Sequence, residues 1–481
     1  MKKNFEISFT KFVIYSLRFI FFTIAIVAAG QLINYLKFKN SMLSVALIAF
    51  YIILGIGVYY GLNKKVKTTT MLLVLIILGL ILRIVWSFSV NSIPVSDFNT
   101  AYRSAGDLLK GDFSMMKGTA YFGRFPHLIG LVLYFAFIRN IFGGSSLLVL
   151  KIINILFSTS TIFLVYLICK EIFSDKKRVI IGTFLAAVFP TSILYTAVYC
   201  TENMAIPFYL GSIYYFFLVV KNKKKEEYLL LSGCLLLIGH LWRSVAQVMI
   251  VAYLLYIIIY YQKKNILKFK ACMYICISFI IPFVIISNTF IWTGMTDRPL
   301  WSGSEPGITS VLKGSNIPTG GRWNDEDAKF IEANLKNEKL LVEESKKKII
   351  ERYTTTAPSD LVYFVFRKVT MQWKEGDFGA AFWAQLQVPQ QDVGIDVANN
   401  GVVWYQLFHL TLLILIIRGL FRKQEYLEKK LINLFYIIFC GYGLTFLILE
   451  SQERYAFIVN WLFIILPLAA VKGDEASVGS N

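Results

Sequence analysis

Asp97 is the carboxylate whose position along this chain best suits a general base. It lies in the segment 94–98 (PVSDF), directly after an apolar run over residues 70–90. A carboxylate at the end of a transmembrane helix has water on one side and lipid on the other. It can accept a proton from a water-borne substrate while the bilayer delivers a second substrate. The other charges on the same side of the membrane decide which reaction Asp97 could serve.

Several further charged side chains stand where apolar runs begin or end. They are Glu202, Lys151, Arg243 and Arg454, and Lys368 lies in a polar region between two runs. The run before Arg243 has about 13 residues, or roughly 20 Å of helix, so this arginine is expected below the membrane surface. An arginine at that depth favours a polar cavity or an anionic ligand, and snorkelling to the headgroups is the alternative. Phosphate oxygens match the planar donor fork of a guanidinium.

The composition is that of a membrane protein. The 481 residues have a mean hydropathy of +0.60, and 56% of them are hydrophobic. A soluble protein of this length needs more charge on its surface. The net charge of +19 comes from short basic bursts between apolar runs, which is an orientation signal and not a nucleic-acid surface. We therefore predict an all-α polytopic membrane protein without a nucleic-acid partner.

The lengths of the apolar runs predict about 12 transmembrane helices. The runs cover roughly residues 12–36, 42–62, 70–90, 146–170, 179–199, 203–220, 228–241, 244–261, 270–292, 401–419, 431–450 and 455–471. If the basic clusters between them are cytoplasmic, both termini lie inside. A crossing by the apolar stretch 126–142 would break this parity, so we predict a juxtamembrane helix there. A true span over 126–142 is the alternative.

The same topology divides the chain into four parts. Residues 1–69 form two N-terminal transmembrane helices, and residues 70–292 form a transmembrane core with an outer loop over 91–146. Residues 293–400 form an outer region with amphipathic helices. Residues 401–481 hold the C-terminal transmembrane helices and a short cytoplasmic tail. The predicted location is the plasma membrane, with the charged site facing outside.

Metal-binding patterns are weak in this sequence. His127 and His240 are too scattered to propose a metal site, and the six cysteines include no Cys-x-x-Cys pair. Asp97 and Glu202 are the two visible carboxylates that could share a divalent cation. We favour an orienting role for Glu202, and a divalent cation is left open; no other cofactor is indicated.

The order of these motifs resembles that of the GT-C glycosyltransferases, which use polyprenyl-phosphate sugars and include protein O-mannosyltransferases and lipid A aminoarabinose transferases. The matching positions are Asp97, Gly111-Asp112, the segment 121–127 (YFGRFPH), Phe142-Gly143, Lys151, Pro190, Glu202, the segment 241–243 (LWR) and Arg454-Tyr455. The resemblance covers about residues 70–471. Three departures are two extra N-terminal spans, one proline where the family has Pro-Pro, and lysine for arginine at position 151. They leave the subfamily and its substrates open.

The resemblance implies a GT-C-like helix bundle with juxtamembrane helices on its outer face. It implies a polyprenyl-phosphate-linked sugar donor in the membrane lipid and a glycan, lipid or protein acceptor, with inversion at the sugar. Asp97 would be the base, and Glu202 would orient the acceptor. Donor phosphate would meet Lys151, Arg243, Arg454 and Lys368. Substrate-positioning residues would be Arg124, His127, His240 and Tyr455.

A transporter or a lipid-linked-glycan flippase is the rival interpretation, because such proteins also bury charges between helices. Transporters usually carry internal repeats and place their charges near the middle of the bilayer. This sequence has no visible repeat, and its charges gather at one face. A scaffold protein would have no need of such a cluster. The enzyme interpretation is therefore favoured, with the sugar and the acceptor unidentified.

Overall fold

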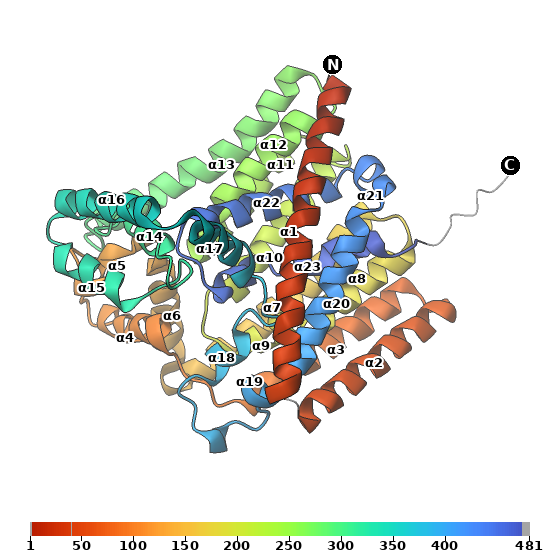
Figure 1. Ribbon diagram of the computed structural model, residues 1–481, viewed down its shortest axis with the longest axis horizontal. Helices are drawn as coiled ribbons and strands as arrows, with labels where there is room; N and C mark the ends of the chain where they lie inside the picture. The colour runs from red at the N-terminus through yellow and green to blue at the C-terminus, as the bar shows by residue number, and fades with distance from the viewer. Residues whose placement is uncertain (1, 40, 474–481) are drawn as a thin grey trace.

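The computed structural model describes residues 2–39 and 41–473, and these form a bundle of helices (Figure 1). The predicted tail after residue 473 lies outside the described residues. The long apolar helices are α1 (Lys2–Phe38), α2 (Met42–Asn63), α3 (Thr68–Ser89), α7 (Ser146–Ile172), α10 (Glu202–Val220), α13 (Asn265–Trp292) and α20 (Val402–Leu420). Shorter apolar helices are α11 (Tyr228–Trp242), α12 (Ala246–Tyr260) and α22 (Ile432–Ile448).

The predicted count of twelve spans is not confirmed. Within the described residues, seven helical segments are long and apolar enough to cross a membrane. The count rises to nine if each of two bent pairs is one span. One pair joins α8 (Lys176–Val188) to Pro190–Ala197 at 42°, and the other joins Glu453–Val459 to Leu462–Ala470 at 64°. The predicted class, a multi-pass all-helical membrane protein, is confirmed.

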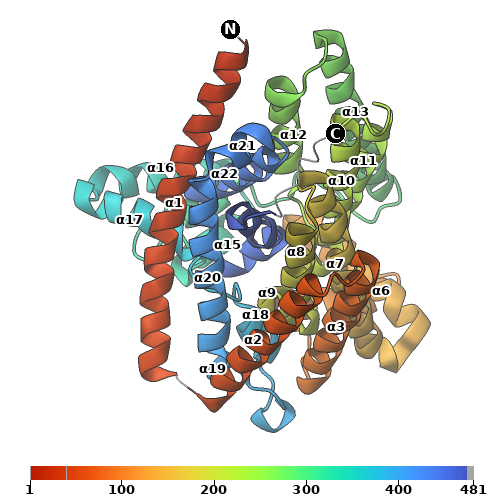
Figure 2. The same cartoon turned by 90° about the vertical axis from the view of Figure 1, so that its right-hand side faces the viewer.

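Two helical groups stand out from the bundle. Figures 1 and 2 show α1 running along α20, and these helices pack together. On the far side from α2, residues 308–371 form a small module, named the outer module after its predicted side, of α14 (Ile308–Gly314), α15 (Asp325–Asn334), α16 (Glu338–Thr355) and α17 (Pro358–Met371). Its own small core joins Leu312, Ile331, Leu335 and Leu341. Residues 293–400 therefore contain several short helices, and their place on the outer side of the membrane stays a prediction.

The apolar stretch 126–142 folds as a short turn, Pro126–Leu128, and helix α6 (Ile129–Phe142). At 14 residues α6 is about 21 Å long, which is less than a hydrocarbon core of about 30 Å. It packs against α4 (Ser96–Leu108) and ends at Gly143, whose φ of +49° turns the chain into α7. Its depth in the membrane stays a prediction.

A fully buried arginine holds the break between α8 and α9 (Pro190–Leu194). Pro190 cannot continue α8, so the last carbonyls of α8 lack helical partners. Arg83 of α3 donates to the carbonyls of Ala186 and Ala187 at 3.2 and 3.1 Å. It also donates to the Ser158 hydroxyl at 2.8 Å and is 0% exposed. Arg83 is therefore a structural cation that replaces missing helical hydrogen bonds.

Arg83→Met is expected to destabilise the protein by about 3 kcal/mol or more, because buried carbonyls are left without donors. The melting temperature in detergent measures the effect. Lys347→Met on α16, where the side chain is 61% exposed, is the matched control and should melt like the wild type. Equal melting of the Arg83 variant and the control would contradict the structural role.

Candidate active site

Asp97 is presented by a short extended segment that the bundle fixes in place. After α3 ends, Val90 forms a β-bridge with Val393, and the Ser92 hydroxyl donates to the Ala197 carbonyl at 2.7 Å. Ser96 has a φ of +51°, an uncommon backbone state for serine, and α4 begins there. Asp97 lies in the first turn of α4, and its side chain is 45% exposed. The carboxylate is therefore accessible on a held backbone.

Asp97 opens into a cavity of about 820 Å³, which is the size of a small-molecule site. Its wall is formed by α1, the start of α4, the segment 375–383, the start of α20 and the segment 452–454. The lining residues are Tyr35, Lys39, Ser96, Asp97, Arg322, Trp323, Glu375, Asp377, Gly379, Ala381, Phe382, Trp383, Ala398, Asn399, Val402, Tyr405, Gln452, Glu453 and Arg454. The wall therefore mixes charged groups with aromatic faces.

Arg454 faces Asp97 in this cavity. Its Nη2 lies 4.0 Å from Asp97 Oδ2, and its guanidinium covers the rings of Phe98 and Trp383 at 5.0 and 4.9 Å. The side chain is 8% exposed. Its Nε and Nη1 find no hydrogen-bond partner among the described residues. Buried polar groups are normally satisfied, so the spare donors of Arg454 suit an anionic ligand.

A second ion pair lies next to the first. Arg243 Nε is 3.4 Å from Oε1 of Glu202, which starts α10 and is 2% exposed. The ring of Tyr455 lies 5.3 Å from the Arg243 guanidinium and 5.9 Å from that of Arg454. Four of the five charges predicted at the outer ends of distant helices are thus gathered around Tyr455; the fifth, Lys151, donates elsewhere, to the Val90 carbonyl. Glu202 faces Arg243 and does not line the cavity.

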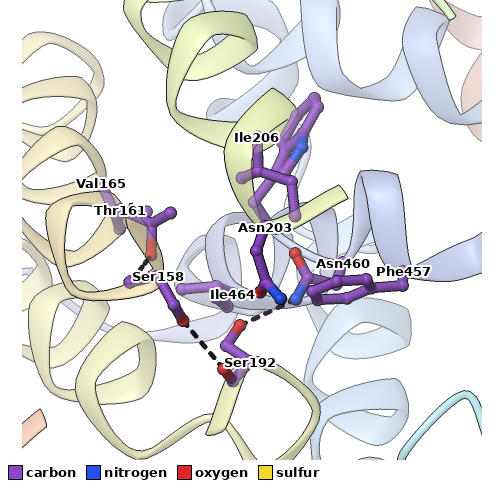
Figure 3. Close-up of a pocket in the computed structure, with 10 residues that line it drawn as sticks. Ser158, Thr161, Val165, Ser192, Asn203, Ile206, Phe457, Asn460 and Ile464 are labelled. Atoms are coloured by element: carbon purple, nitrogen blue, oxygen red, sulfur yellow. Dashed lines mark hydrogen bonds between the residues drawn. The ribbon is translucent and has the colours of Figure 1, made fainter. Parts of the chain in front are cut away.

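The start of α10 rests on a buried polar network (Figure 3). Ser158 of α7 donates to the Ser192 carbonyl at 2.9 Å, and Asn460 donates to the Ser192 hydroxyl at 2.8 Å. Asn203, the neighbour of Glu202, donates to the Tyr195 carbonyl at 2.8 Å. These groups surround a cavity of about 10 Å³, the space of roughly one water molecule. The network connects both bent helix pairs to α7, and it holds the start of α10, where Glu202 lies.

Lys151 and Lys368 do not line the cavity, and their ammonium groups donate hydrogen bonds to backbone carbonyls. Lys151 donates to the Val90 carbonyl at 2.8 Å and so caps the end of α3. Lys368 donates to the carbonyls of Gly314 and Leu449 at 2.5 and 2.9 Å. Burial lowers the pKa of Lys368 to about 8. The geometry thus indicates that these lysines join backbone segments through carbonyl hydrogen bonds and does not favour them as phosphate ligands.

The four residues predicted to position the substrate also differ in what they contact. Arg124 donates to Glu305 at 2.6 and 2.9 Å, which joins the first outer loop to the outer module. His240 packs edge-on against Phe279 and Phe283, and its Nδ1 has no partner in the described chain. His127 is exposed. Of the four, Tyr455 alone touches both site arginines.

Several residues in or beside the cavity were given no role of their own from the sequence. Tyr121 lies beside Asp97, and burial together with the Asp97 charge raises its pKa. Glu375, Asp377 and Trp383 come from one segment, 375–383 (EGDFGAAFW), whose signal was two carboxylates among apolar residues. In the described residues no three metal-ligating side chains gather, and each of the carboxylates considered for a divalent cation faces an arginine.

Asp377 should make stability depend on pH. It is 3% exposed, and burial, followed by the Glu375 charge, raises its pKa to about 7. The folded state then keeps its proton up to about pH 7 while the unfolded chain releases it near 3.8, so stability falls from about pH 4 to about pH 7 and then levels. We expect about 1.4 kcal/mol per pH unit.

The measurement for Asp377 is the difference in unfolding free energy between wild type and Asp377→Asn in detergent at several pH values. Subtracting the variant cancels the titration of other groups. A difference that does not change between pH 5 and pH 7 would contradict the raised pKa. Asp360→Asn on α17 is a control that should leave the pH profile unchanged.

Comparisons with known proteins find a family model and similar solved structures. Residues 129–292, about a third of the chain, match the family model of dolichyl-phosphate-mannose-protein mannosyltransferases. Two crystal structures of an Archaeoglobus fulgidus oligosaccharyltransferase, one tethered to an acceptor peptide and one in the apo form, are similar in fold with TM-scores of 0.47. Identities are 14% and 13%, and 85% of this chain is covered in both.

The chain spans about half the length of these oligosaccharyltransferase chains, 49% and 51%. A search of curated proteins finds no match. The match over residues 129–292 includes α6, α7, α10 and the Glu202–Arg243 pair, so it covers half of the charge cluster. The family match over residues 129–292 supports the GT-C resemblance expected from the sequence, in a chain whose apolar helices are those of a multi-pass membrane protein.

Proposed function

We propose that the protein transfers a sugar from a polyprenyl-phosphate donor to a hydroxyl acceptor at the outer face of the membrane. The observation that carries this proposal is the Asp97–Arg454 pair on the cavity wall. It combines an accessible carboxylate with a buried guanidinium that keeps two donors free. The family model adds support, because dolichyl-phosphate-mannose, the donor in the name of that family, is a sugar linked to a lipid phosphate.

The reaction needs one displacement. Asp97 takes the proton of the acceptor hydroxyl as its oxygen attacks the anomeric carbon. The bond between that carbon and the phosphate oxygen breaks, and its electron pair stays on the leaving polyprenyl phosphate. Attack from the opposite face inverts the anomeric configuration. The phosphate is a good leaving group, so no general acid is required.

The arginines have separate tasks in this reaction. Arg454 supplies the N–H groups of two unpartnered nitrogens, Nε and Nη1, to the phosphate oxygens, where charge develops as the bond breaks. Arg243 adds positive charge beside Tyr455, and Glu202 holds its guanidinium in place. Glu202 is thus a positioning residue for Arg243 in our proposal. In this proposal other residues of the cavity wall, and not Glu202, orient the acceptor.

Purified protein in lipid nanodiscs tests the proposal with polyprenyl-phosphate hexoses and a cell-envelope extract as acceptor. We expect release of polyprenyl phosphate that depends on the extract, and a product anomer opposite to that of the donor. Retained configuration would overturn the single displacement. No release with any donor, together with movement of intact lipid-linked sugar between leaflets, would favour the flippase alternative.

A further inference from the structure

One part of the cavity wall depends on the two N-terminal helices, α1 and α2. Tyr35 of α1 donates its hydroxyl to Glu375 Oε2 at 2.6 Å, and its ring meets that of Tyr405 edge-on at 6.5 Å. The Ser44 hydroxyl of α2 donates to the Asn400 carbonyl at 2.7 Å. These contacts join residues more than 300 positions apart. Helix α1 therefore contributes to the cavity wall, and α2 is bonded to Asn400, next to the lining residue Asn399.

Glu375 is held in one orientation by this arrangement. Oε2 accepts from Tyr35, while Oε1 lies 3.6 Å from Lys374 Nζ, and the side chain is 14% exposed. A carboxylate oxygen can accept more than one hydrogen bond, so Glu375 keeps acceptor capacity toward the cavity. Bonds from a ligand hydroxyl to such a carboxylate are charge-assisted and strong.

The rest of the wall suits a ligand with many hydroxyl groups. Asn399 and Gln452 bring amides, and Glu453, which pairs with Arg322, brings another carboxylate. Trp323 and Trp383 add flat aromatic faces, and Trp323 is 52% exposed. Alternating acceptors, donors and aromatic faces match a sugar ring, whose hydroxyls point outward and whose C–H faces are apolar.

A polypeptide acceptor fits this wall less well. Extended peptides are commonly bound by adding a strand to an exposed sheet edge. Within the described chain, β-pairing is limited to the single Val90–Val393 bridge, so no sheet edge is offered. Tyr35 of α1 and the following Lys39 border the cavity on one side, and no strand among the described residues there could pair with an extended peptide.

We propose that Glu375, positioned by Tyr35, selects a glycan acceptor by binding its hydroxyl groups in the cavity beside Asp97. This inference rests on the proposed transfer reaction. It assigns acceptor specificity to the wall that α1 completes. Glu375 contacts the acceptor, whereas Tyr35 acts through Glu375 as a positioning residue.

The acceptor class is tested with portions of one cell-envelope extract. Periodate, which cleaves vicinal diols, destroys glycans, and protease removes polypeptides. We expect the periodate-treated extract to lose acceptor-dependent release of polyprenyl phosphate and the protease-treated extract to keep it. Loss with protease and retention after periodate would overturn the inference in favour of a protein acceptor.

The residue assignment is tested by the KM and kcat of the variants. Glu375→Gln should raise the acceptor KM about tenfold or more, with a smaller change in kcat, because one charge-assisted bond is lost. Tyr35→Phe should raise KM less and serves where the first variant fails to fold. Glu343→Gln on α16, 68% exposed, is the matched control. An unchanged acceptor KM in both variants would refute the assignment.

The two proposals fail in different ways. If the wild type releases no polyprenyl phosphate from any donor, the transfer reaction itself is refuted. If release occurs and the Glu375 and Tyr35 variants keep the wild-type acceptor KM, only the acceptor assignment is lost. Melting temperatures of both variants separate a weakened cavity from a misfolded one.

Discussion

Asp97→Asn is expected to lower kcat for sugar transfer by about 10²–10⁴-fold while the protein stays folded. The amide keeps the shape of the side chain but cannot take the proton of the acceptor hydroxyl. The carboxylate is 45% exposed, so its loss should change unfolding little. Rates of polyprenyl-phosphate release, at saturating donor and acceptor, measure the effect.

Asp107→Asn is the matched control for this prediction. Asp107 lies on the same helix, α4, but does not line the cavity. The same chemical change there should leave the rate within about twofold of the wild type, as is usual for a substitution outside a site. A rate for Asp97→Asn as high as that of the control would remove Asp97 from the reaction.

The charge cluster could be predicted because a membrane restricts where charges can lie. The ends of spanning helices meet one of two surfaces, and charges prefer those ends. Parity therefore placed Asp97, Glu202, Arg243 and Arg454 on one side, and the structure brings them together around Tyr455. The predicted membrane side of each helix end was therefore enough to predict which of these charges lie together.

The partners of each charge could not be predicted in the same way. Lys151 and Arg454 both stand at helix ends, yet Lys151 is occupied by carbonyls while Arg454 keeps free donors. A carbonyl partner leaves no mark in a sequence, because every residue carries one. The contact of Tyr35 with Glu375 also depends on packing between segments 340 positions apart.

The helix count was uncertain for a related reason. Hydropathy measures how apolar a segment is, but it does not show where the segment bends. Pro190 breaks one apolar stretch at 42°, and the last one bends by 64°. Both breaks serve the site: Arg83 holds the first, and the second carries Arg454 in the turn Glu453–Val459. Irregular backbone in a membrane is tolerated where it lines a cavity.

Arg454→Gln is expected to lower kcat/KM for the donor by about 10²–10³-fold without loss of stability. The guanidinium is buried with two nitrogens unpartnered in the described chain, so the Asp97 pair and the ring contacts compensate only part of the cost of burying it. Removing the charge relieves that cost, and the melting temperature should stay equal or rise. The transferred phosphate loses the donors that stabilise its developing charge.

Arg83 is a second buried arginine with which Arg454 can be compared. Both arginines are buried, but Arg83 is hydrogen-bonded to protein carbonyls and a hydroxyl, whereas Arg454 is not saturated. Loss of Arg83 should therefore reduce stability, and loss of Arg454 should reduce donor turnover. Arg298→Gln, at a surface pair 37% exposed, should change neither. If the Arg454 variant melts as early as the Arg83 variant, or keeps its donor kcat/KM, Arg454 is a structural residue and the phosphate must be bound elsewhere.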